Sequence, residues 1–258
     1  MSIDLEVDGE GVATITINRP EVRNALDAEH YAGLTAAWMR VRDDTAIRCA
    51  IITGAGDRAF CAGADLKSFI GREFELAELW LTQKGQLLNR GLEVWKPVIA
   101  AVNGACMGGG VTLLLATDIR VCVPGATFGL SEVKRGIIAA NGGTQRVAAQ
   151  LPHAIAMEML LTGDPMDAAR AERWGLVNAI VPPERLMETA RDYARRIAAN
   201  APLAVQAAKE LAVRSRDVAL EDGLRMEQMV NRILQGSQDV QEGRAAFREK
   251  RAPRFEGR

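Results

Sequence analysis

The stretch "VNGACMGGGVTLLLATD", from Val102 to Asp118, contains three consecutive glycines that run straight into an apolar segment. Because glycine lacks a Cβ, its backbone N–H group can come close to a ligand or to a neighbouring strand. The stretch is not a nucleotide loop, since no G-x-x-x-x-G-K-[ST] is present and "GACMGGG" does not fit G-x-G-x-x-G. The glycines therefore predict either close packing of a helix on a sheet or a binding loop of another kind.

Segments around these glycines alternate between strand and helix patterns. "CAIITG" and "KPVIAAVNG" are typical of buried strands that end in glycine, and "DIRVCV" predicts a third, short strand. At the N-terminus, "IDLEV" and "VATITIN" predict a hairpin across "DGEG". After Asp27, a candidate N-cap, apolar residues follow at helical spacing: Tyr31, Leu34, Trp38 and Val41. This alternation predicts an α/β fold.

The last third of the chain is predominantly helical in pattern. "DPMDAARAERWG" predicts a helix capped by Asp167 and closed by Gly175. From Pro183 onward the pattern predicts successive helices, with breaks near "NAPLA" and "GSQD". We expect a core over residues 1–200 and a helical region over 201–258. Because no low-complexity linker separates them, the second region should be closely docked.

Composition excludes several classes of protein. The chain has 258 residues, is 48% hydrophobic and 25% charged, and carries a formal net charge of -1. This balance argues against a surface for nucleic acid or anionic membrane, and no apolar run approaches the roughly 20 residues that span a bilayer. The N-terminus lacks a signal-peptide core, so we expect a soluble, cytoplasmic protein. With four cysteines in no CxxC pair and only two histidines, no metal site is expected.

Three places are rich in glycine: "AFCAGADLK" (Ala59 to Lys67), "GACMGGG" (Gly104 to Gly110) and "AANGGTQR" (Ala139 to Arg146). The first two each follow a strand pattern and precede a helical segment. The N–H groups at the start of a helix lack intrahelical acceptors, so two such starts can converge on one oxygen. A pair of this kind forms an oxyanion hole.

Several segments in this order resemble the crotonase family, the enoyl-CoA hydratase/isomerase superfamily. They are "TITINRPEVRNAL", "AFCAGADLK", "KPVIAAVNGACMGGG", "FGLSEVKRGI…NGGTQR" and "EGRAAFREKRAPRF", and together they extend over nearly the whole chain. The resemblance implies a crotonase-like spiral core of ββα repeats and a C-terminal helical region that forms homotrimers or homohexamers. It also implies an acyl-CoA substrate, with no cofactor besides the coenzyme A of that thioester.

The resemblance also implies the location of the substrate. The backbone N–H groups of Ala64 and Gly109 would bind the thioester oxygen and stabilise an enolate. Coenzyme A would lie along two loops, mostly against backbone atoms of Val22, Arg23, Ala62, Asp65 and Leu66. The acyl pocket would be lined by the segment from Phe69 to Leu88, with candidates Phe69, Ile70, Leu76, Leu79 and Trp80, although a helix covering the core would show the same apolar residues.

Catalytic carboxylates are the point at which this chain departs from the hydratase pattern. The best-known hydratases use two glutamates; the first position is Thr112 here, and the second is Glu132 in "FGLSE", preceded by Ser131 in place of proline. Adding water needs a base for the water and a proton for the α-carbon, and a threonine hydroxyl can orient water but is no general base. Moving a double bond needs only one carboxylate. Hydration and isomerisation therefore both remain open.

Other readings also remain open. The acyl group can be branched, cyclic or carnitine-linked, and a crotonase-like body can serve as a non-catalytic binding protein. The candidate residues of a subunit interface lie in the last third: Met226, Met229, Val230, Ile233 and Leu234. An ordinary intrachain core would use the same residues.

Overall fold

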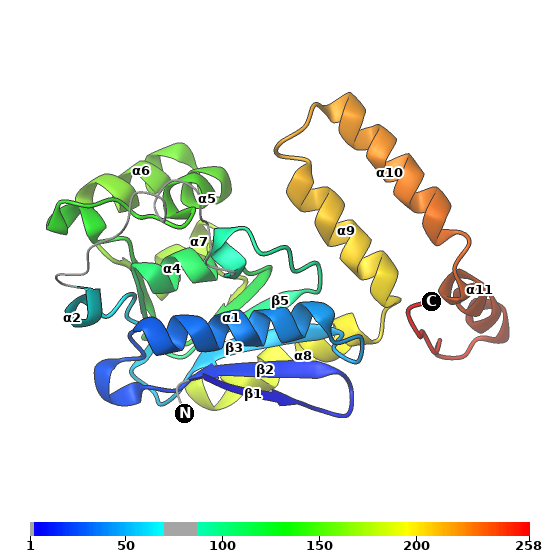
Figure 1. The fold of residues 1–258 in the computed structure, drawn as a ribbon, viewed down its shortest axis with the longest axis horizontal. Helices are drawn as coiled ribbons and strands as arrows, with labels where there is room; N and C mark the ends of the chain where they lie inside the picture. The colour runs from blue at the N-terminus through cyan, green and yellow to red at the C-terminus, as the bar shows by residue number, and fades with distance from the viewer. Residues whose placement is uncertain (1–2, 70–86) are drawn as a thin grey trace.

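The computed structural model describes residues 3–69 and 87–258, and within them the chain forms two β-sheets (Figure 1). The larger sheet has, in order, β1 (Ile3–Val7), β2 (Val12–Ile17), β3 (Cys49–Gly54), β5 (Val98–Val102), β7 (Ile119–Cys122) and β10 (Ala179–Ile180). The smaller sheet has β4 (Ala59–Cys61), β6 (Ala105–Met107), β8 (Thr127–Gly129) and β9 (Met166–Asp167). The predicted hairpin and the three predicted strands are confirmed.

From β3 to β8 the backbone follows a spiral that alternates between a strand of the larger sheet and a strand of the smaller sheet. β3 leads to β4, β5 to β6, and β7 to β8. Pairing is parallel between successive turns in both sheets, with Ile51 opposite Ile99 in the larger one and Cys106 opposite Phe128 in the smaller one. This confirms the α/β spiral of ββα repeats. The strands of the smaller sheet were not predicted separately, because two or three residues are too few to show an alternating pattern.

Helices surround the two sheets. They are η1 (Pro20–Val22), α1 (Ala28–Asp43), α2 (Leu66–Phe69), η2 (Leu88–Arg90), α4 (Gly109–Leu114), η3 (Glu132–Arg135), α5 (Gly143–Gln150), α6 (His153–Thr162), α7 (Ala168–Arg173), η4 (Pro183–Arg185) and α8 (Leu186–Ala198). Both predicted caps are confirmed: Asp27 accepts from the backbone N–H of His30 at 3.0 Å, and Asp167 from that of Arg170 at 2.8 Å. Each cap satisfies an N–H group that the helix leaves without an acceptor.

Arg120 on β7 fixes the end of α4. Its side chain is buried, and it donates to the carbonyls of Leu115, Thr117 and Leu176 and to Oε1 of Gln150. Since Leu115 directly follows α4, these bonds hold the helix of the glycine triplet against the larger sheet. A buried guanidinium is tolerated here because its N–H groups find carbonyl acceptors.

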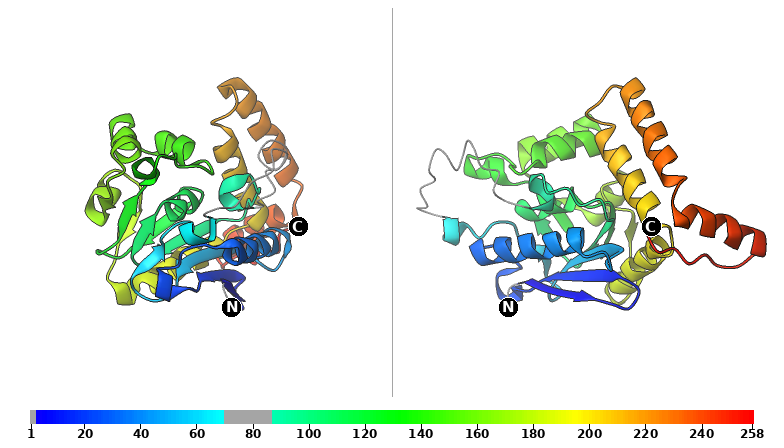
Figure 2. Two further views of the ribbon diagram at one scale, coloured as in Figure 1. Left: turned by 60° about the vertical axis from the view of Figure 1, so that its left-hand side comes forward. Right: turned by 45° about the vertical axis from the view of Figure 1, so that its right-hand side comes forward.

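The C-terminal helices α9 (Pro202–Arg214), α10 (Leu220–Leu234) and α11 (Gln238–Glu249) extend away from the core, with α9 and α10 side by side (Figures 1 and 2). Of the five residues proposed for an interface, Met229 and Ile233 are 67% and 73% exposed, and the others are half-buried. The break at residue 200 falls between α8 and α9, and the two-region division stays a prediction. No helix in 3–69 or 87–258 is long and apolar enough to cross a membrane.

The glycine triplet meets a steric requirement at Gly110. A Cβ there would lie 2.4 Å from the carbonyl oxygen and 3.0 Å from the Cβ of Cys61 on β4. We expect Gly110→Ala to lower the free energy of unfolding by about 1–3 kcal/mol, the usual cost of overpacking, as measured by urea denaturation.

Gly223 on α10 provides the matched control. The nearest atom to a Cβ at this position is 3.6 Å away, which is ordinary van der Waals contact. Gly223→Ala should therefore raise stability by up to about 1 kcal/mol, because alanine is the better helix former. If Gly110→Ala also stabilised the protein, close packing of α4 on β4 would not be the reason for this glycine.

Candidate active site

Three segments that are far apart in the sequence meet at one edge of the smaller sheet. Ala62 to Asp65 follows β4, Gly108 to Gly110 follows β6, and Leu130 to Glu132 follows β8. Because β4, β6 and β8 are parallel neighbours, their carboxyl ends lie side by side. The backbone N–H of Gly108 donates to the carbonyl of Gly129 at 2.8 Å and joins the second segment to the end of β8.

Two backbone N–H groups lie next to each other at this edge. Leu26 forms a parallel bridge with Ala64, in which its N–H donates to Gly63 and its carbonyl accepts from Asp65, each at 2.8 Å. This pattern leaves the N–H of Ala64 outside the bridge. Gly109 is the first residue of α4, so its N–H has no acceptor within the helix. The position of a Gly109 Cβ lies 3.5 Å from the Ala64 nitrogen, so the two residues are close neighbours.

Glycine is required beside these donors. Gly63 has φ 92°, and a Cβ there would lie 2.9 Å from the carbonyl oxygen of Met107 and 3.0 Å from the nitrogen of Gly109. Gly108 has φ 52°, and its Cβ position lies 3.3 Å from Oε1 of Glu132. Both φ values are ones that other residues rarely adopt. The bare backbone thus leaves room both at the donors and at the carboxylate.

Glu132 is the first residue of η3, and its carboxylate is partly removed from water. The side chain is half-buried, and Oε2 is buried without a hydrogen-bond partner among the described residues. Burial raises the pKa of Glu132 above its ordinary value of 4.5, although the charge of Arg135 acts in the opposite direction. A carboxylate that is partly removed from water is a stronger base than an exposed one.

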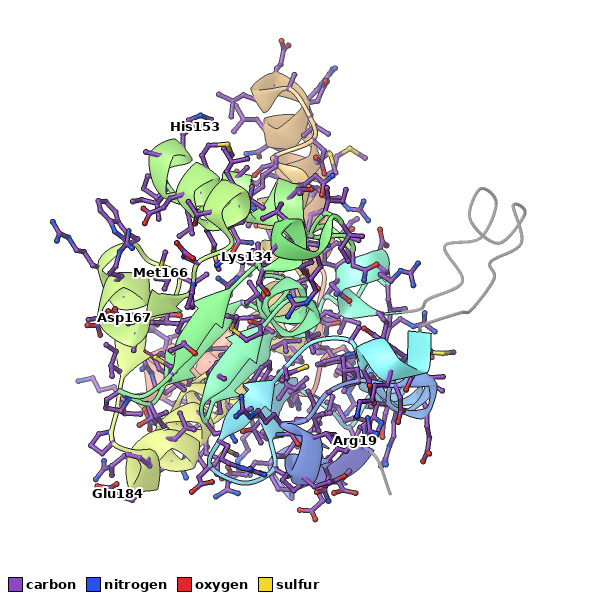
Figure 3. The ribbon with its side chains drawn as sticks, turned by 90° about the vertical axis from the view of Figure 1, so that its left-hand side faces the viewer. Arg19, Lys134, His153, Met166, Asp167 and Glu184 are labelled. Atoms are coloured by element: carbon purple, nitrogen blue, oxygen red, sulfur yellow. The ribbon has the colours of Figure 1, made fainter. Side chains whose placement is uncertain are left out.

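Side-chain contacts of Lys134 and Arg135 hold η3 in position. Lys134 packs its side chain over Gly163 and pairs with Asp164, after α6. Arg135 donates to the carbonyl and to the hydroxyl of Ser131. Figure 3 shows Lys134 near the edge strand β9, where Met166 and Asp167 are labelled. These contacts hold Glu132 at the end of β8.

Thr112 lies one turn along α4 from Gly109 and is only 2% exposed. Its hydroxyl donates to the carbonyl of Gly109 at 3.0 Å and accepts from the side-chain amide of Asn89 at 2.9 Å. Its methyl group faces Gly143, where a Cβ would lie 2.8 Å away. Since its single proton is already donated, this hydroxyl can only accept a hydrogen bond from a water. A role for Thr112 in catalysis stays a prediction.

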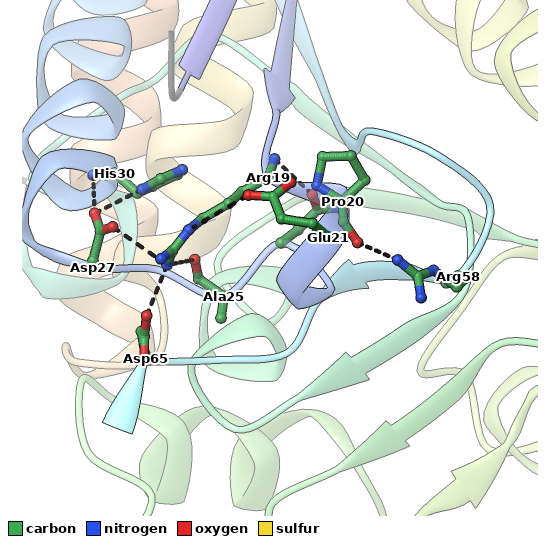
Figure 4. Close-up of polar contacts among 9 residues, drawn as sticks. Arg19, Pro20, Glu21, Ala25, Asp27, His30, Arg58 and Asp65 are labelled. Carbon is green, nitrogen blue, oxygen red and sulfur yellow. Dashed lines mark hydrogen bonds and ion pairs between the residues drawn. The ribbon is translucent and has the colours of Figure 1, made fainter. Parts of the chain in front are cut away.

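Arg19 connects the loop of the donors to the start of α1 (Figure 4). Its Nη1 lies 2.8 Å from Oδ2 of Asp65 and 3.3 Å from Oδ2 of Asp27, and it donates to the carbonyl of Ala25 at 3.2 Å. The bond from Arg19 is the main reason why the pKa of Asp65 is lowered. Sequence reasoning missed Arg19, although the segment "TITINRPEVRNAL" contains it.

The residues proposed to contact coenzyme A lie beside one another. Val22 and Arg23 are exposed, with Arg23 in the left-handed region at φ 57°. The carbonyl of Arg23 accepts from the N–H of Ala62 at 3.0 Å, which joins the two loops. Leu66 begins α2. The proposed acyl-pocket residues Ile70, Leu76, Leu79 and Trp80 lie outside the described residues, as does the Phe69 side chain.

Metal and thiol chemistry find no support in the part of the chain that the structure describes. Residues 3–69 and 87–258 contain no group of three His, Cys, Asp or Glu side chains that could hold a metal ion. Burial raises the pKa values of Cys49, Cys61 and Cys122 to about 12. Such thiols remain protonated near neutral pH and are poor nucleophiles.

The arrangement at the edge of the smaller sheet is two backbone donors with a basic carboxylate beside them. A family model described as Enoyl-CoA hydratase/isomerase matches residues 8–258. The chain belongs to the enoyl-CoA hydratase/isomerase family. It is an enzyme of the hydratase/isomerase type, with the spiral fold of that family.

Known family members are similar to the chain over its whole length. It is 44% identical to the (E)-benzylidenesuccinyl-CoA hydratase of Thauera aromatica and 41% identical to the carnitinyl-CoA dehydratase of Proteus mirabilis, with 100% of both chains covered in each case. The crystal structure of an enoyl-CoA hydratase from Bacillus anthracis is 35% identical, with a TM-score of 0.93 and 100% of both chains covered. An acyl-CoA substrate fits this family.

Proposed function

We propose that the chain catalyses the reversible hydration of a 2-enoyl-CoA thioester through an enolate. The observation that carries this proposal is the position of the Glu132 carboxylate, whose Oε1 lies 3.3 Å from the Cβ position of Gly108, the residue directly before Gly109. The two N–H groups bind the thioester oxygen and stabilise the negative charge that develops on it. Glu132 transfers the proton.

A single carboxylate is enough for hydration if it first accepts a proton and then donates the same proton. Glu132 accepts a proton from water as the water oxygen bonds to the β-carbon and the electrons of the double bond move to the thioester oxygen. The carboxylic acid then gives that proton to the α-carbon as the carbonyl re-forms. In the reverse direction the same steps release water, so the balance needs no cofactor besides the coenzyme A of the substrate.

The substrate we infer carries a specialised acyl group. The hydratase and the dehydratase that match the full chain at 44% and 41% identity are named for benzylidenesuccinyl-CoA and carnitinyl-CoA, neither of which is a plain straight-chain thioester. Val22, Arg23, Ala62, Asp65 and Leu66 line the path of coenzyme A in this proposal. The helical region 201–258 assembles the chain into homotrimers or homohexamers.

The test is an assay of the purified protein on a panel of thioesters. We expect turnover of a trans-2-enoyl-CoA, and higher kcat/KM for (E)-benzylidenesuccinyl-CoA or for the dehydration of carnitinyl-CoA than for the straight-chain compound. Absence of both hydration and dehydration across the panel, with coenzyme A thioesters still bound, would favour a non-catalytic binding protein.

Double-bond isomerisation is the second candidate. It is favoured by Thr112, which occupies the position where the best-known hydratases have their other glutamate. One carboxylate removes a proton from one carbon and returns it to another, while the same oxyanion hole stabilises the dienolate. Conversion of a 3-enoyl-CoA at a higher kcat/KM than hydration of any 2-enoyl-CoA would establish isomerisation as the main activity.

Adding a carboxylate at position 112 should change the balance between these activities. We expect Thr112→Glu to raise kcat for hydration by about tenfold, because the two proton transfers are then divided between two groups, and general acid–base catalysis contributes at least this much. Thr112→Gln is the matched control, since it has nearly the same volume and cannot transfer a proton. Equal rates for the two variants, both folded, would contradict the prediction.

A further inference from the structure

The first turn of α1 brings a phenol hydroxyl next to the two backbone donors. Tyr31 is the fourth residue of α1 and packs against the core. The position of a Gly109 Cβ lies 3.5 Å from Oη of Tyr31 and also 3.5 Å from the nitrogen of Ala64. Oη of Tyr31 and the nitrogen of Ala64 therefore both lie close to Gly109.

The ion pairs of Arg19 fix this hydroxyl relative to the oxyanion hole. One guanidinium nitrogen of Arg19 contacts Asp27, the N-cap of α1, and Asp65, the residue after Ala64. Asp27 in turn bonds Nδ1 of His30 at 2.7 Å and the His30 backbone at 3.0 Å. The start of α1 and the loop of the hole are thus held by one set of charges (Figure 4).

The surroundings of Tyr31 keep its hydroxyl protonated. Burial raises the pKa of Tyr31 to about 12, with the proximity of Cys61 acting in the same direction. A phenol in this state keeps its proton throughout the neutral pH range. A hydrogen bond from a neutral donor to an oxyanion is shorter and roughly twice as strong as one to a neutral oxygen.

We propose that Tyr31 is a further catalytic residue, whose hydroxyl donates to the thioester oxygen as that oxygen becomes the enolate, together with the N–H groups of Ala64 and Gly109. This inference rests on the proposed function, because it concerns the same oxygen. The ground-state thioester carries little charge on this oxygen, whereas the enolate carries nearly a full one. The contribution of Tyr31 therefore falls on the transition state and should appear in kcat rather than in KM.

The chain provides a matched control for the test. It contains only two tyrosines, and the other, Tyr193, lies on α8, where the guanidinium of Arg196 stands 5.4 Å from its ring. We expect Tyr31→Phe to lower kcat by about 10- to 100-fold, the range for a hydrogen bond to a charged group, with KM changed less than about threefold. Tyr193→Phe should leave both within about twofold of the wild type.

The affinity for an enolate analogue distinguishes a catalytic role of Tyr31 from a role in packing alone. Acetoacetyl-CoA can bind as its enolate, whereas butyryl-CoA cannot. Calorimetry should show that Tyr31→Phe lowers the affinity for acetoacetyl-CoA by about the same factor as it lowers kcat. The affinity for butyryl-CoA should stay nearly unchanged. An unchanged kcat and enolate affinity would overturn the proposal, and so would an equal loss for the two ligands, which would indicate a packing role.

A second measurement does not depend on the Tyr31→Phe variant. In Tyr193→Phe protein, biosynthetic 3-fluorotyrosine labels position 31 alone, and its ¹⁹F resonance should shift on addition of acetoacetyl-CoA and less on addition of butyryl-CoA. No shift with acetoacetyl-CoA would overturn the inference. If the wild type turns over no thioester of the panel, the proposed function fails; if it does and Tyr31→Phe equals it, only the role of Tyr31 fails.

Discussion

Glu132→Gln is expected to lower kcat for hydration by about 10²- to 10⁴-fold, the contribution that general acid–base catalysis typically makes. The reason is that the amide keeps the shape of the side chain but can neither accept the proton of water nor return it to the α-carbon. The measurement is steady-state kinetics on the preferred thioester. Undiminished activity on both 2-enoyl- and 3-enoyl-CoA would show that Glu132 is not the base.

The same variant should be more stable than the wild type at neutral pH. Oε2 of Glu132 is buried without a hydrogen-bond partner in residues 3–69 and 87–258, and burial raises the pKa of the carboxyl above 4.5. Since the folded state binds this proton more tightly than the unfolded state, ionisation of Glu132 destabilises the fold as pH rises through the raised pKa. We expect Glu132→Gln to gain about 1 kcal/mol above that pH and nothing well below 4.5. A loss of stability at neutral pH would contradict this assignment.

The pH dependence of activity follows from the same shift. Hydration requires the ionised form of Glu132, so kcat/KM should fall as pH decreases through its raised pKa, that is, above 4.5. Glu132→Gln should abolish this decrease of kcat/KM at low pH. Arg135→Gln tests the same assignment, because the Arg135 charge lowers the pKa of Glu132. Removing that charge should move the decrease of kcat/KM to higher pH.

Removing the N–H of Gly109 should have the second largest effect. Gly109→Pro deletes this donor at the first position of α4, the one place in a helix that accepts proline well. We expect kcat to fall by about 10²- to 10³-fold, the usual effect of losing one oxyanion-hole donor. Affinity for acetoacetyl-CoA should fall with it.

Gly109→Ala is the control for this prediction. It keeps the N–H, and its Cβ would stand 3.5 Å from its nearest neighbours, which is ordinary contact. We expect a loss of less than about tenfold. If alanine and proline lowered kcat by the same factor, the cause would be steric crowding at position 109, and Gly109 would not be a donor.

Much of the fold could be predicted from the residues because local patterns encode it. The apolar runs of β3 and β5 are buried on both faces, so their sequences show no alternation, and Asp27 and Asp167 cap helices by the chemistry of their side chains. The smaller sheet has no such signal. Its strands of two or three residues are stable only because neighbouring turns of the spiral pair with them.

The candidate site likewise combines residues that sequence motifs identify with residues that only the tertiary structure identifies. The glycines and Glu132 could be named from motifs, because only glycine permits positive φ with close approach and only certain side chains move protons. Arg19 and Tyr31 could not, because their roles depend on which side chains meet across the fold. Arg19 is 46 residues from Asp65 in sequence, yet lies 2.8 Å from it, and Tyr31 has the apolar periodicity of any core-facing helical residue.

The sequence by itself determined the strand–helix alternation, the family and the uncharged residue at position 112, because these depend on composition and local spacing. Tertiary structure alone decided that the ends of β4, β6 and β8 are neighbours, that the carboxylate of Glu132 is desolvated, and that the Thr112 hydroxyl is already bonded to Gly109 and Asn89. The physical reason is that parallel pairing between turns of the spiral, and not proximity in sequence, brings these groups together.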